Sequence, residues 1–400
     1  MTAADRPRRV AIVVHSAFPA DPRVRRQADS LVEAGYEVDV LCLREEGEAA
    51  EERDGALRIV RLPVRRRFAG FAGHLAEYLV FTGLAAIRLA REHRRRRYRL
   101  VEVATLPDFL VVAAAAPKML GVPLLLDLHE DMPAFFDDRF NAPVLRPFKP
   151  LVRGVARASA AMADHLLTVH EPLRQLSIAR GVAPDKISVV MNSPDERLFD
   201  PQSAARRGFM EDGELRLVHV SNLQRIYGLS VAVEAMARLG EVPAHLDVYG
   251  DGPYRAEIEA AIAASGVADR VALHGRVPVE QLPAILAGAD AAVVPSLPEP
   301  YMELSLSTKL LEAVAMGVPV IASDLATFRS HFSEAALRYV PGGDPSALAA
   351  AIRELAADPA AAAARAAEAR REAEPYAWRI QAARYLEVVG RMVERRNASR

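Results

Sequence analysis

Residues 304–323 read LSLSTKLLEAVAMGVPVIAS, in which a Ser/Thr segment leads into an apolar helical run that ends at glycine. Gly317 and Pro319 end this helix and begin the next strand. Lys309 and Glu312 stand three residues apart at the head of the helix. Only four of the 51 Lys and Arg residues of the chain are lysine. A lysine beside a carboxylate here favours a role for a compact ammonium group, although an ordinary first-turn helix residue is the simpler interpretation.

The same alternation of strand and helix recurs along the chain. Short β-branched runs alternate with helical stretches, from RRVAIVVHS to KISVVMNS in the first half and from LRLVHVSN to ALRYVPGG in the second. Continuous apolar strands separated by helices predict a parallel sheet that is covered on both faces. Between the halves, residues 192–209 are polar and contain proline, as expected of a linker. The sequence therefore predicts two doubly wound α/β domains.

The composition is that of a globular protein. Four hundred residues with 51% hydrophobic content are enough for two substantial cores. The single cysteine, Cys42, excludes a disulfide framework and a cysteine-based metal site. We predict no signal peptide, because the apolar run near the N-terminus is too short.

A basic block is concealed by the net charge of −1. Between Arg61 and Arg99 there are eleven arginines against Glu77 and Glu92. The block encloses an apolar stretch, residues 68–90, which is too interrupted by polar residues to cross a membrane. Such a helix suits an anionic membrane surface or a nucleic acid, or it is a domain helix with a solvated arginine end. We expect peripheral attachment to an anionic membrane through residues 65–99, and no nucleic acid partner.

The motifs in these strands and loops resemble those of glycosyltransferases of the GT-B fold, most of all the retaining enzymes of family 4. In the first half the resemblance rests on DPRVRRQADSLVEAGYEVDVL, LPDFLVVAAAAPKMLGVPLLLDLHE and ISVVMNSPDERLF. In the second it rests on LVHVSNL, LDVYGDGP, VALHGRVP, LAGADAAVVPS and KLLEAVAMGVPVIAS. It implies two Rossmann-like parallel-sheet domains that face a cleft. We expect an acceptor-side domain at 1–195, a linker at 196–210, a nucleotide-sugar domain at 211–374, and a helix at 375–400 that packs back on the first domain.

The donor side should meet the charge of a leaving nucleoside diphosphate. That charge grows as the glycosidic bond breaks, so cations and helix N-termini are expected to face it. The resemblance implies that Lys309 and the backbone N–H groups near Thr308 meet the diphosphate. It also implies that Glu312 accepts hydrogen bonds from the donor ribose. The other expected donor-side residues are Ser307, Asn222, Gly250, Gly252, Gly275, Arg276 and Glu303.

The sequence departs from the family pattern after the first strand of the second half. The family usually has an Arg and a Lys there, whereas this chain has Asn222 and Tyr227 at the nearest positions. Arg225 is the one cation of that loop, and we interpret it as the substitute clamp for the diphosphate. A further family glutamate is replaced by Leu304, while Glu299 and Glu303 lie nearby in a longer loop. Either glutamate is a candidate for donor contact or for simple solvation of the loop.

The acceptor side is expected at strand ends of the first half. His129, in the sequence DLHE, matches the family histidine that hydrogen-bonds the donor sugar near the reacting carbon. Asp21 is expected on the acceptor side, with helix capping as its alternative role. The other acceptor-side candidates are Arg23, Arg25, Asp108 and Glu130.

The resemblance implies a retaining glycosyltransferase with His129, Arg225 and Lys309 as its catalytic residues. It would move a sugar from a nucleoside-diphosphate donor to a hydroxyl of a lipid-linked, polysaccharide-precursor or small-molecule acceptor, in the cytoplasm and in cell-envelope polysaccharide synthesis. No Asp-x-Asp motif is present, so we expect neither a metal nor a cofactor. Two alternatives stay open: a sugar-nucleotide epimerase of the same fold, and a catalytically degenerate donor-binding partner protein.

Overall fold

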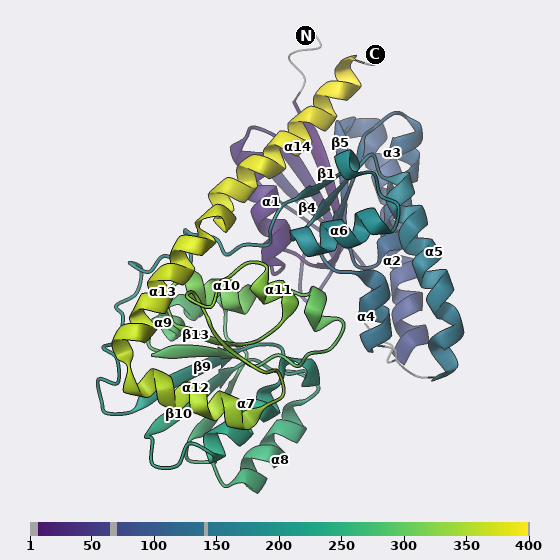
Figure 1. Ribbon diagram of the computed structural model, residues 1–400. Helices are drawn as coiled ribbons and strands as arrows, with labels where there is room; N and C mark the ends of the chain where they lie inside the picture. Colours follow the sequence, from purple (N-terminus) through teal and green to yellow (C-terminus); the bar gives the residue numbers. More distant parts are fainter. Residues whose placement is uncertain (1–6, 65–69, 140–142, 399–400) are drawn as a thin grey trace. The chain divides into compact units, whose positions relative to one another are not determined.

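The computed structural model describes residues 7–64, 70–139 and 143–398. The chain forms two compact units (Figure 1). Unit 1 comprises Met1–Asn192 together with Ile380–Arg400, and unit 2 comprises Ser193–Arg379. Each unit has one sheet of mainly parallel strands with helices between successive strands. The prediction of two Rossmann-like α/β domains is therefore confirmed.

Unit 1 contains an eight-stranded sheet in the order β3-β4-β2-β1-β5-β6-β7-β8. Every neighbouring pair is parallel except β3 with β4. The strands are β1 (Arg9–Ala17), β2 (Glu37–Leu43), β3 (Glu51–Asp54), β4 (Leu57–Leu62), β5 (Leu100–Ala104), β6 (Leu124–Leu128), β7 (His165–Thr168) and β8 (Ile187–Val189). The helices are α1 (Pro22–Glu33), α2 (Gly70–Arg96), η2 (Asp108–Ala114), α3 (Ala115–Met119), α4 (Met132–Arg139), η3 (Pro143–Phe148), α5 (Lys149–Met162), α6 (Glu171–Ala179) and η4 (Pro184–Lys186).

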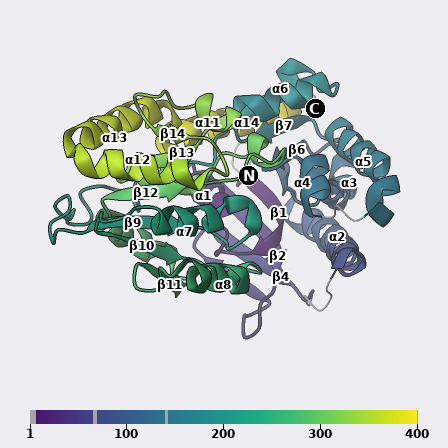
Figure 2. The same ribbon diagram turned by 60° about the horizontal axis from the view of Figure 1, so that its bottom comes forward.

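Unit 2 contains a six-stranded parallel sheet in the order β11-β10-β9-β12-β13-β14 (Figure 2). Its strands are β9 (Leu215–Val220), β10 (Ala244–Tyr249), β11 (Val271–Gly275), β12 (Ala291–Val294), β13 (Val320–Ser323) and β14 (Arg338–Val340). Its helices are η5 (Arg225–Tyr227), α7 (Leu229–Ala237), α8 (Arg255–Ser265), η6 (Val279–Gln281), α9 (Leu282–Ala287), η7 (Met302–Leu304), α10 (Thr308–Ala315), α11 (Ala326–Arg329), α12 (Pro345–Ala357), α13 (Pro359–Ala373) and η8 (Glu374–Tyr376).

The central strands have continuous apolar sequences because both of their faces are covered. Residues 10–14 of β1 and 291–294 of β12 are buried without a break. An exposed face would require alternate polar residues, and these strands have none. The carboxyl ends of parallel strands lie at one edge of each sheet, so the loops that leave that edge are where the site residues should gather.

Two glycines of unit 2 let its strand-end loops pack against one another. A Cβ atom on Gly250 would lie 1.8 Å from the carbonyl oxygen of Ser221, and one on Gly228 would lie 1.8 Å from that of Pro295. Both glycines also have positive φ values, of +139° and +67°. Glycine is therefore required at both positions for the loops after β9, β10 and β12 to come together.

The C-terminal helix α14 (Trp378–Ala398) belongs to unit 1 from Ile380 onward. Tyr385 is buried and donates a hydrogen bond to the buried carboxylate of Glu102 in β5. The side-chain oxygen of Gln381 accepts a hydrogen bond of 2.9 Å from the backbone N–H of Met191. These two polar contacts join α14 to the sheet and to the last residues before unit 2.

The segment expected as a linker, residues 196–210, lies within unit 2. Arg207 forms an ion pair of 2.8 Å with Asp290, and Arg206 donates to the carbonyl oxygen of Gly317. These contacts tie the segment to the loops before β12 and β13. The observed boundaries are after Asn192 and after Arg379, against the expected 195 and 374.

Helix α2 is longer than the apolar stretch at 68–90 suggested, because it continues through the arginine cluster to Arg96. Its last turn carries His93, Arg94, Arg95 and Arg96, where cations are favoured by the partial negative charge of a helix C-terminus. No helix among residues 7–64, 70–139 and 143–398 has both the length and the apolar run needed to cross a membrane.

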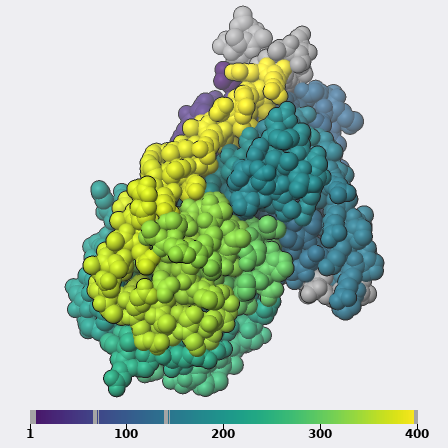
Figure 3. Space-filling view, viewed as in Figure 1, coloured from purple at the N-terminus to yellow at the C-terminus, as the bar shows by residue number. Residues whose placement is uncertain are grey.

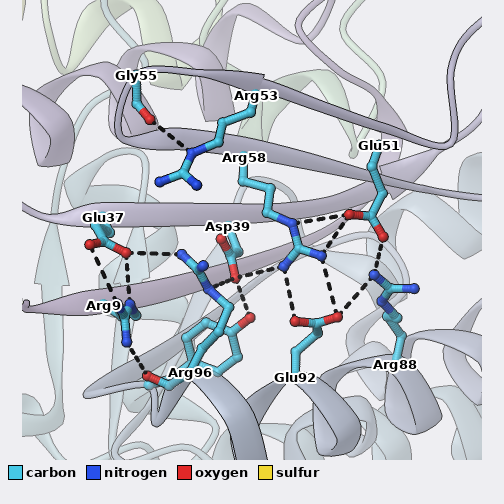
Figure 4. A network of polar contacts seen from close by, with 11 residues as sticks. Arg9, Glu37, Asp39, Glu51, Arg53, Gly55, Arg58, Arg88, Glu92 and Arg96 are labelled. Atoms are coloured by element: carbon cyan, nitrogen blue, oxygen red, sulfur yellow. Dashed lines mark hydrogen bonds and ion pairs between the residues drawn. The ribbon is translucent and has the colours of Figure 1, made fainter.

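A network of ion pairs fastens the end of α2 to the sheet of unit 1 (Figure 4). At its centre Arg58 of β4 contacts Glu92 of α2 at 2.9 Å, Glu51 of β3 at 2.7 Å and Asp39 of β2 at 3.6 Å. Asp39 is fully buried, so its charge depends on these partners and on Arg96 at 2.6 Å. The remaining members of the network are Arg9, Glu37, Arg88 and Tyr98.

Replacing Arg58 by methionine should destabilise unit 1 strongly. The variant keeps most of the side-chain length but leaves the carboxylates of Asp39 and Glu92 buried with fewer partners, so we expect a loss of about 3 kcal/mol in the free energy of unfolding. Urea unfolding followed by circular dichroism measures it. The matched control is Arg53→Met, because Arg53 is exposed in the same hairpin and forms no ion pair among the described residues, where it donates a hydrogen bond to the carbonyl of Gly55. Equal stability of the two variants would contradict the role given to Arg58.

Candidate active site

Lys309, predicted to lie on the donor side, is in the first turn of α10, in unit 2. Its ammonium nitrogen is 3.1 and 3.2 Å from the two carboxylate oxygens of Glu312. The Lys309 side chain is 34% exposed and that of Glu312 is 11% exposed, so the pair is half-open to solvent. Ser307 is the N-cap residue of α10, but its side chain makes no capping hydrogen bond. The backbone N–H groups that follow Ser307, beginning with that of Thr308, therefore have no side-chain cap.

Arg225, in the loop after β9, pairs with a loop that precedes α10. Its guanidinium lies 2.9 Å from the Glu299 carboxylate, and both side chains are partly exposed. The backbone N–H of Leu297 donates to the carbonyl of Ile226 at 2.8 Å, which holds the two loops together. The structure therefore brings Arg225, the predicted substitute clamp, into the same loop cluster that leads to Lys309. Asn222 lies in the same loop as Arg225 and is exposed.

Other donor-side candidates make contacts that stabilise the fold of unit 2. The Glu303 carboxylate accepts a hydrogen bond of 2.7 Å from the backbone N–H of Ala326 at the start of α11. Gly252, like Gly250, is required by close packing, because its Cβ would lie 2.5 Å from the Leu223 carbonyl oxygen. Gly275 has a φ of +77° but open space around it, and Arg276 beside it is exposed.

A pocket of about 380 Å³ in unit 2 lies elsewhere on the sheet. It is lined by residues of β9, β10 and α9, among them Arg216, Asp247 and Tyr249. None of the donor-side residues predicted from the sequence lines it.

His129 follows β6 at the carboxyl edge of the unit 1 sheet. It is 9% exposed, and its Nε2 atom lies 3.1 Å from Oδ2 of Asp127. The same Asp127 oxygen accepts a hydrogen bond of 2.6 Å from the Gln27 amide. Burial alone would raise the pKa of Asp127, but the neighbouring His129 and the Gln27 bond bring it below its usual value. Nδ1 of His129 is buried and has no hydrogen-bond partner among the described residues.

Asp21 is the N-cap residue of α1, so its capping role is observed. Its carboxylate accepts from the backbone N–H of Arg23 at 3.1 Å and forms an ion pair with the Arg23 guanidinium at 3.0 Å. Burial alone would raise the pKa of Asp21, but Arg23 and, less strongly, His129 hold it well below its usual range. Arg25 pairs with Asp29 one turn further along α1 at 2.8 Å. Arg23 and Arg25, both in the first turns of α1, are thus engaged with carboxylates of α1 or of its cap.

Asp108 begins η2, directly after β5, and is 4% exposed. Its Oδ1 atom has no hydrogen-bond partner within the described part of the chain. Burial, and next the nearby Asp131 carboxylate, raise the pKa of Asp108 to about 7, although Arg180 opposes this shift. The backbone N–H of Asp108 contacts the Met132 sulfur at 3.4 Å, so Asp108 lies beside the turn that carries His129. Glu130 lies in that turn and is half-buried.

Two histidine pairs were not assigned from the sequence. His15, at the end of β1, lies 3.2 Å from Glu77 of α2, and both side chains are buried. His219, in β9, bonds the carbonyl of Val293 and the hydroxyl of Ser221, each at 2.8 Å. Burial lowers the pKa of His219. Both pairs join segments that are distant in sequence, so spacing along the chain does not reveal them. Only His15 has a signal in the sequence, because it stands at the end of a predicted strand, where site residues are expected.

Family models match both halves of the chain. The model described as "Glycosyl transferase 4-like domain" matches residues 20–193, and the model described as "Glycosyl transferases group 1" matches residues 214–358. Curated relatives with similar sequences include the 2-deoxystreptamine glucosyltransferase of Streptomyces kanamyceticus, 27% identical over 78% of this chain and 75% of its own. Another is the D-inositol 3-phosphate glycosyltransferase of Thermobispora bispora, 33% identical over 58% of this chain and 57% of its own.

Solved structures share the fold over nearly the whole chain. The sucrose-phosphate synthase of Thermosynechococcus elongatus superposes with a TM-score of 0.78 at 20% identity, over 96% of this chain and 99% of its own. HepE of Anabaena in complex with UDP-glucose superposes with a TM-score of 0.71 at 16% identity, over the same shares. The chain therefore belongs to the family 4-like glycosyltransferases and has the GT-B fold.

Asp108 gives the site a measurable pH signature. Its carboxyl titrates near 3.8 in an unfolded chain and near 7 in the fold, so the folded state keeps a proton that the unfolded chain has lost between these values. Stability should fall as pH rises through this window, by up to roughly 4 kcal/mol. Asp108→Asn cannot ionise at this position. Its melting temperature, relative to that of the parent, should therefore rise between pH 4 and pH 7 and remain higher above pH 7.

The control for this measurement is Asp269→Asn, because Asp269 is exposed. Thermal melting of the three proteins in a series of buffers provides the comparison. A constant difference between parent and Asp108→Asn at every pH would show that the Asp108 carboxyl titrates normally.

Proposed function

We propose that the chain transfers a sugar from a nucleoside-diphosphate sugar to an acceptor hydroxyl with retention of the anomeric configuration. The observation that carries the proposal is the half-exposed Lys309–Glu312 pair at the start of α10, whose N-terminus has no side-chain cap. An ammonium ion beside free backbone N–H groups suits a diphosphate, and a nearly buried carboxylate suits a ribose diol. The solved structures of HepE with UDP and with UDP-glucose support a donor of this chemical class.

In this proposal the residues of unit 2 act on the leaving group. Lys309 and the first turn of α10 stabilise the charge that develops on the departing diphosphate, and Arg225 adds a second cation once it leaves Glu299. The acceptor hydroxyl attacks C1 on the face from which the phosphate departs, so the anomeric configuration is retained. The departing phosphate oxygen accepts the proton of that hydroxyl. The bond from C1 to the phosphate oxygen breaks as the bond from C1 to the acceptor oxygen forms. No protein nucleophile takes part.

The residues of unit 1 position the sugar and the acceptor. Nδ1 of His129, which lacks a protein partner in the described chain, is proposed to bind a donor sugar hydroxyl. Asp108, with an unpartnered oxygen beside the same turn, is proposed to orient the acceptor hydroxyl, and Glu130 lies close in sequence. Relatives named for 2-deoxystreptamine support a small polyhydroxyl acceptor, and the relative named for amylovoran biosynthesis supports a polysaccharide precursor.

We also propose a peripheral location on the inner face of a membrane, where a lipid-linked precursor would be met. The expectation rested on residues 65–99, of which residues 65–69 lie outside the described residues. It is modified by the network of Figure 4, because Arg88 and Arg96 are engaged with carboxylates and do not contribute free positive charge.

Lys309→Ala should lower kcat/KM by on the order of tenfold to a few hundredfold, because a charge-assisted hydrogen bond is worth roughly 1.5–3 kcal/mol. The loss should fall mainly on kcat, since the leaving-group charge is greatest in the transition state. Lys309→Arg should restore only part of the rate, because a planar guanidinium replaces a point charge. Glu312→Gln should instead raise KM for the donor by loss of ribose contacts.

Steady-state kinetics with a panel of UDP-, GDP-, ADP- and TDP-sugars and radiolabelled acceptors measure these effects. The matched control is Lys118→Ala, because Lys118 also forms a partly exposed ion pair, 2.7 Å from Asp164. A normally folded Lys309→Ala enzyme with full activity would remove the proposed diphosphate site. Nucleotide release without sugar transfer to any acceptor would favour the epimerase instead.

Turnover should survive EDTA. The proposed counter-charges are Arg225, Lys309 and a helix terminus, and the described residues contain no group of three or more His, Cys, Asp or Glu side chains that could hold a metal ion. Transfer rates before and after chelation and dialysis check this prediction. Loss of activity that returns with Mg²⁺ or Mn²⁺ would contradict it.

A further inference from the structure

The exposed large hydrophobic side chains of the described residues are all in one part of unit 1. Nine such side chains are exposed, and every one lies between residues 75 and 151. Single exposed apolar residues are normal on protein surfaces, but a concentration in one region indicates an interaction site. They are Leu75, Leu79, Val80 and Ile87 of α2, Val112 of η2, Met119 and Leu120 at the end of α3, Phe148 of η3 and Leu151 of α5.

Helix α2 is apolar on its exposed side as well as on its buried side. Leu75, Leu79 and Ile87 recur at multiples of four residues, so they lie along one exposed face. Phe81, fully buried, belongs to the opposite face, which packs into the core of unit 1. A helix at the surface of a globular domain normally carries polar residues on its outer face. The outer face of α2 is therefore adapted to something other than water.

The elements that carry these residues are neighbours. Segment η2 packs against α2, α3 and α5. Figures 1 and 2 both show α2, α3 and α5 grouped on the same side of unit 1, and Figure 3 shows α5 at the surface of that unit. We call the exposed apolar residues of α2, η2, α3, η3 and α5 the apolar surface.

Most of the exposed charge beside the apolar surface is positive, and the carboxylates of Asp137 and Asp164 are paired with lysines. Four exposed arginines end α2 or directly follow it, and three more lie on η3 and α5. None of the seven forms an ion pair within the described part of the chain. On α2 the carboxylates of Glu77 and Glu92 are both buried, and α5 contains no carboxylate. The seven are Arg91, Arg94, Arg95, Arg97, Arg146, Arg153 and Arg157.

We propose that the apolar surface and its seven arginines dock the chain on an anionic lipid membrane. Apolar side chains enter the interface while arginines meet lipid phosphates, which accounts for both properties of the same region. A second copy of the chain is a poorer partner, because a symmetric contact would bring like charges together. A nucleic acid would leave the apolar residues without a function. The inference rests on the proposed peripheral location and names the surface responsible for it.

Co-sedimentation of the full chain with lipid vesicles tests the proposal. The chain should bind vesicles that contain phosphatidylglycerol at low salt, release them at high salt, and bind pure phosphatidylcholine vesicles far more weakly. Arg153→Ala with Arg157→Ala should lower the partition coefficient by about fivefold for each arginine. Leu79→Ser with Val80→Ser should lower it at every salt concentration, because it removes the apolar part of the contact.

The matched control is Arg384→Ala, since Arg384 is an exposed helical arginine of α14 without an ion pair among the described residues. It should bind like the parent. Equal binding of the control and both double variants, or equal binding to neutral vesicles, would overturn the proposal. So would a dimer, seen by light scattering, that Leu79→Ser with Val80→Ser converts to a monomer.

Donor turnover with a soluble acceptor separates this result from the proposed function. The two double variants should transfer sugar at the parental rate, since neither changes a site residue. Transfer without vesicle binding would overturn the docking surface alone. Vesicle binding without transfer would overturn the enzymatic proposal and leave the surface standing.

Discussion

The structure depends on one constraint, which is that parallel strands covered on both faces can expose functional groups only where they end. The hydrogen bonds and side chains of β1, β5, β6, β9 and β12 are committed to the sheets and cores. The polar residues of interest therefore lie in the loops at the carboxyl edges, among them His129 in unit 1 and Arg225 in unit 2. Gly228 and Gly250 belong to the same constraint, because loops this close leave no room for a Cβ atom.

Arginine serves two different purposes in unit 1. In the network of Figure 4, Arg58 and Arg96 compensate the charge of Asp39, which is fully buried. Other arginines near the end of α2, such as Arg94 and Arg95, face solvent without an ion pair among the described residues. A count of arginines along the sequence cannot separate the two groups. The separation depends on β2 and β4 lying beneath the end of α2, which is a property of the sheet order.

Two buried carboxyl groups of unit 1 show how similar surroundings serve different ends. Glu102 is raised in pKa by burial and by Asp127, and it accepts a hydrogen bond from Tyr385 that helps to hold α14. Burial also raises the pKa of Asp108, and each of these two carboxyl groups has one oxygen without a hydrogen-bond partner among the described residues. The two groups differ in position, because Glu102 lies within β5 and bonds α14, whereas Asp108 lies at the start of η2, beyond the end of that strand.

The sequence by itself determined the two α/β domains, because the apolar strand pattern and the intervening helices depend on residues that are close together in the chain. It also determined that Lys309, Glu312 and His129 lie where helices begin or strands end. Only the tertiary structure decided what each side chain contacts. Glu303 caps α11, and Arg225 pairs with Glu299, 74 residues away. Such contacts depend on which loops meet at the edge of a sheet, and the spacing of residues along a chain does not specify that.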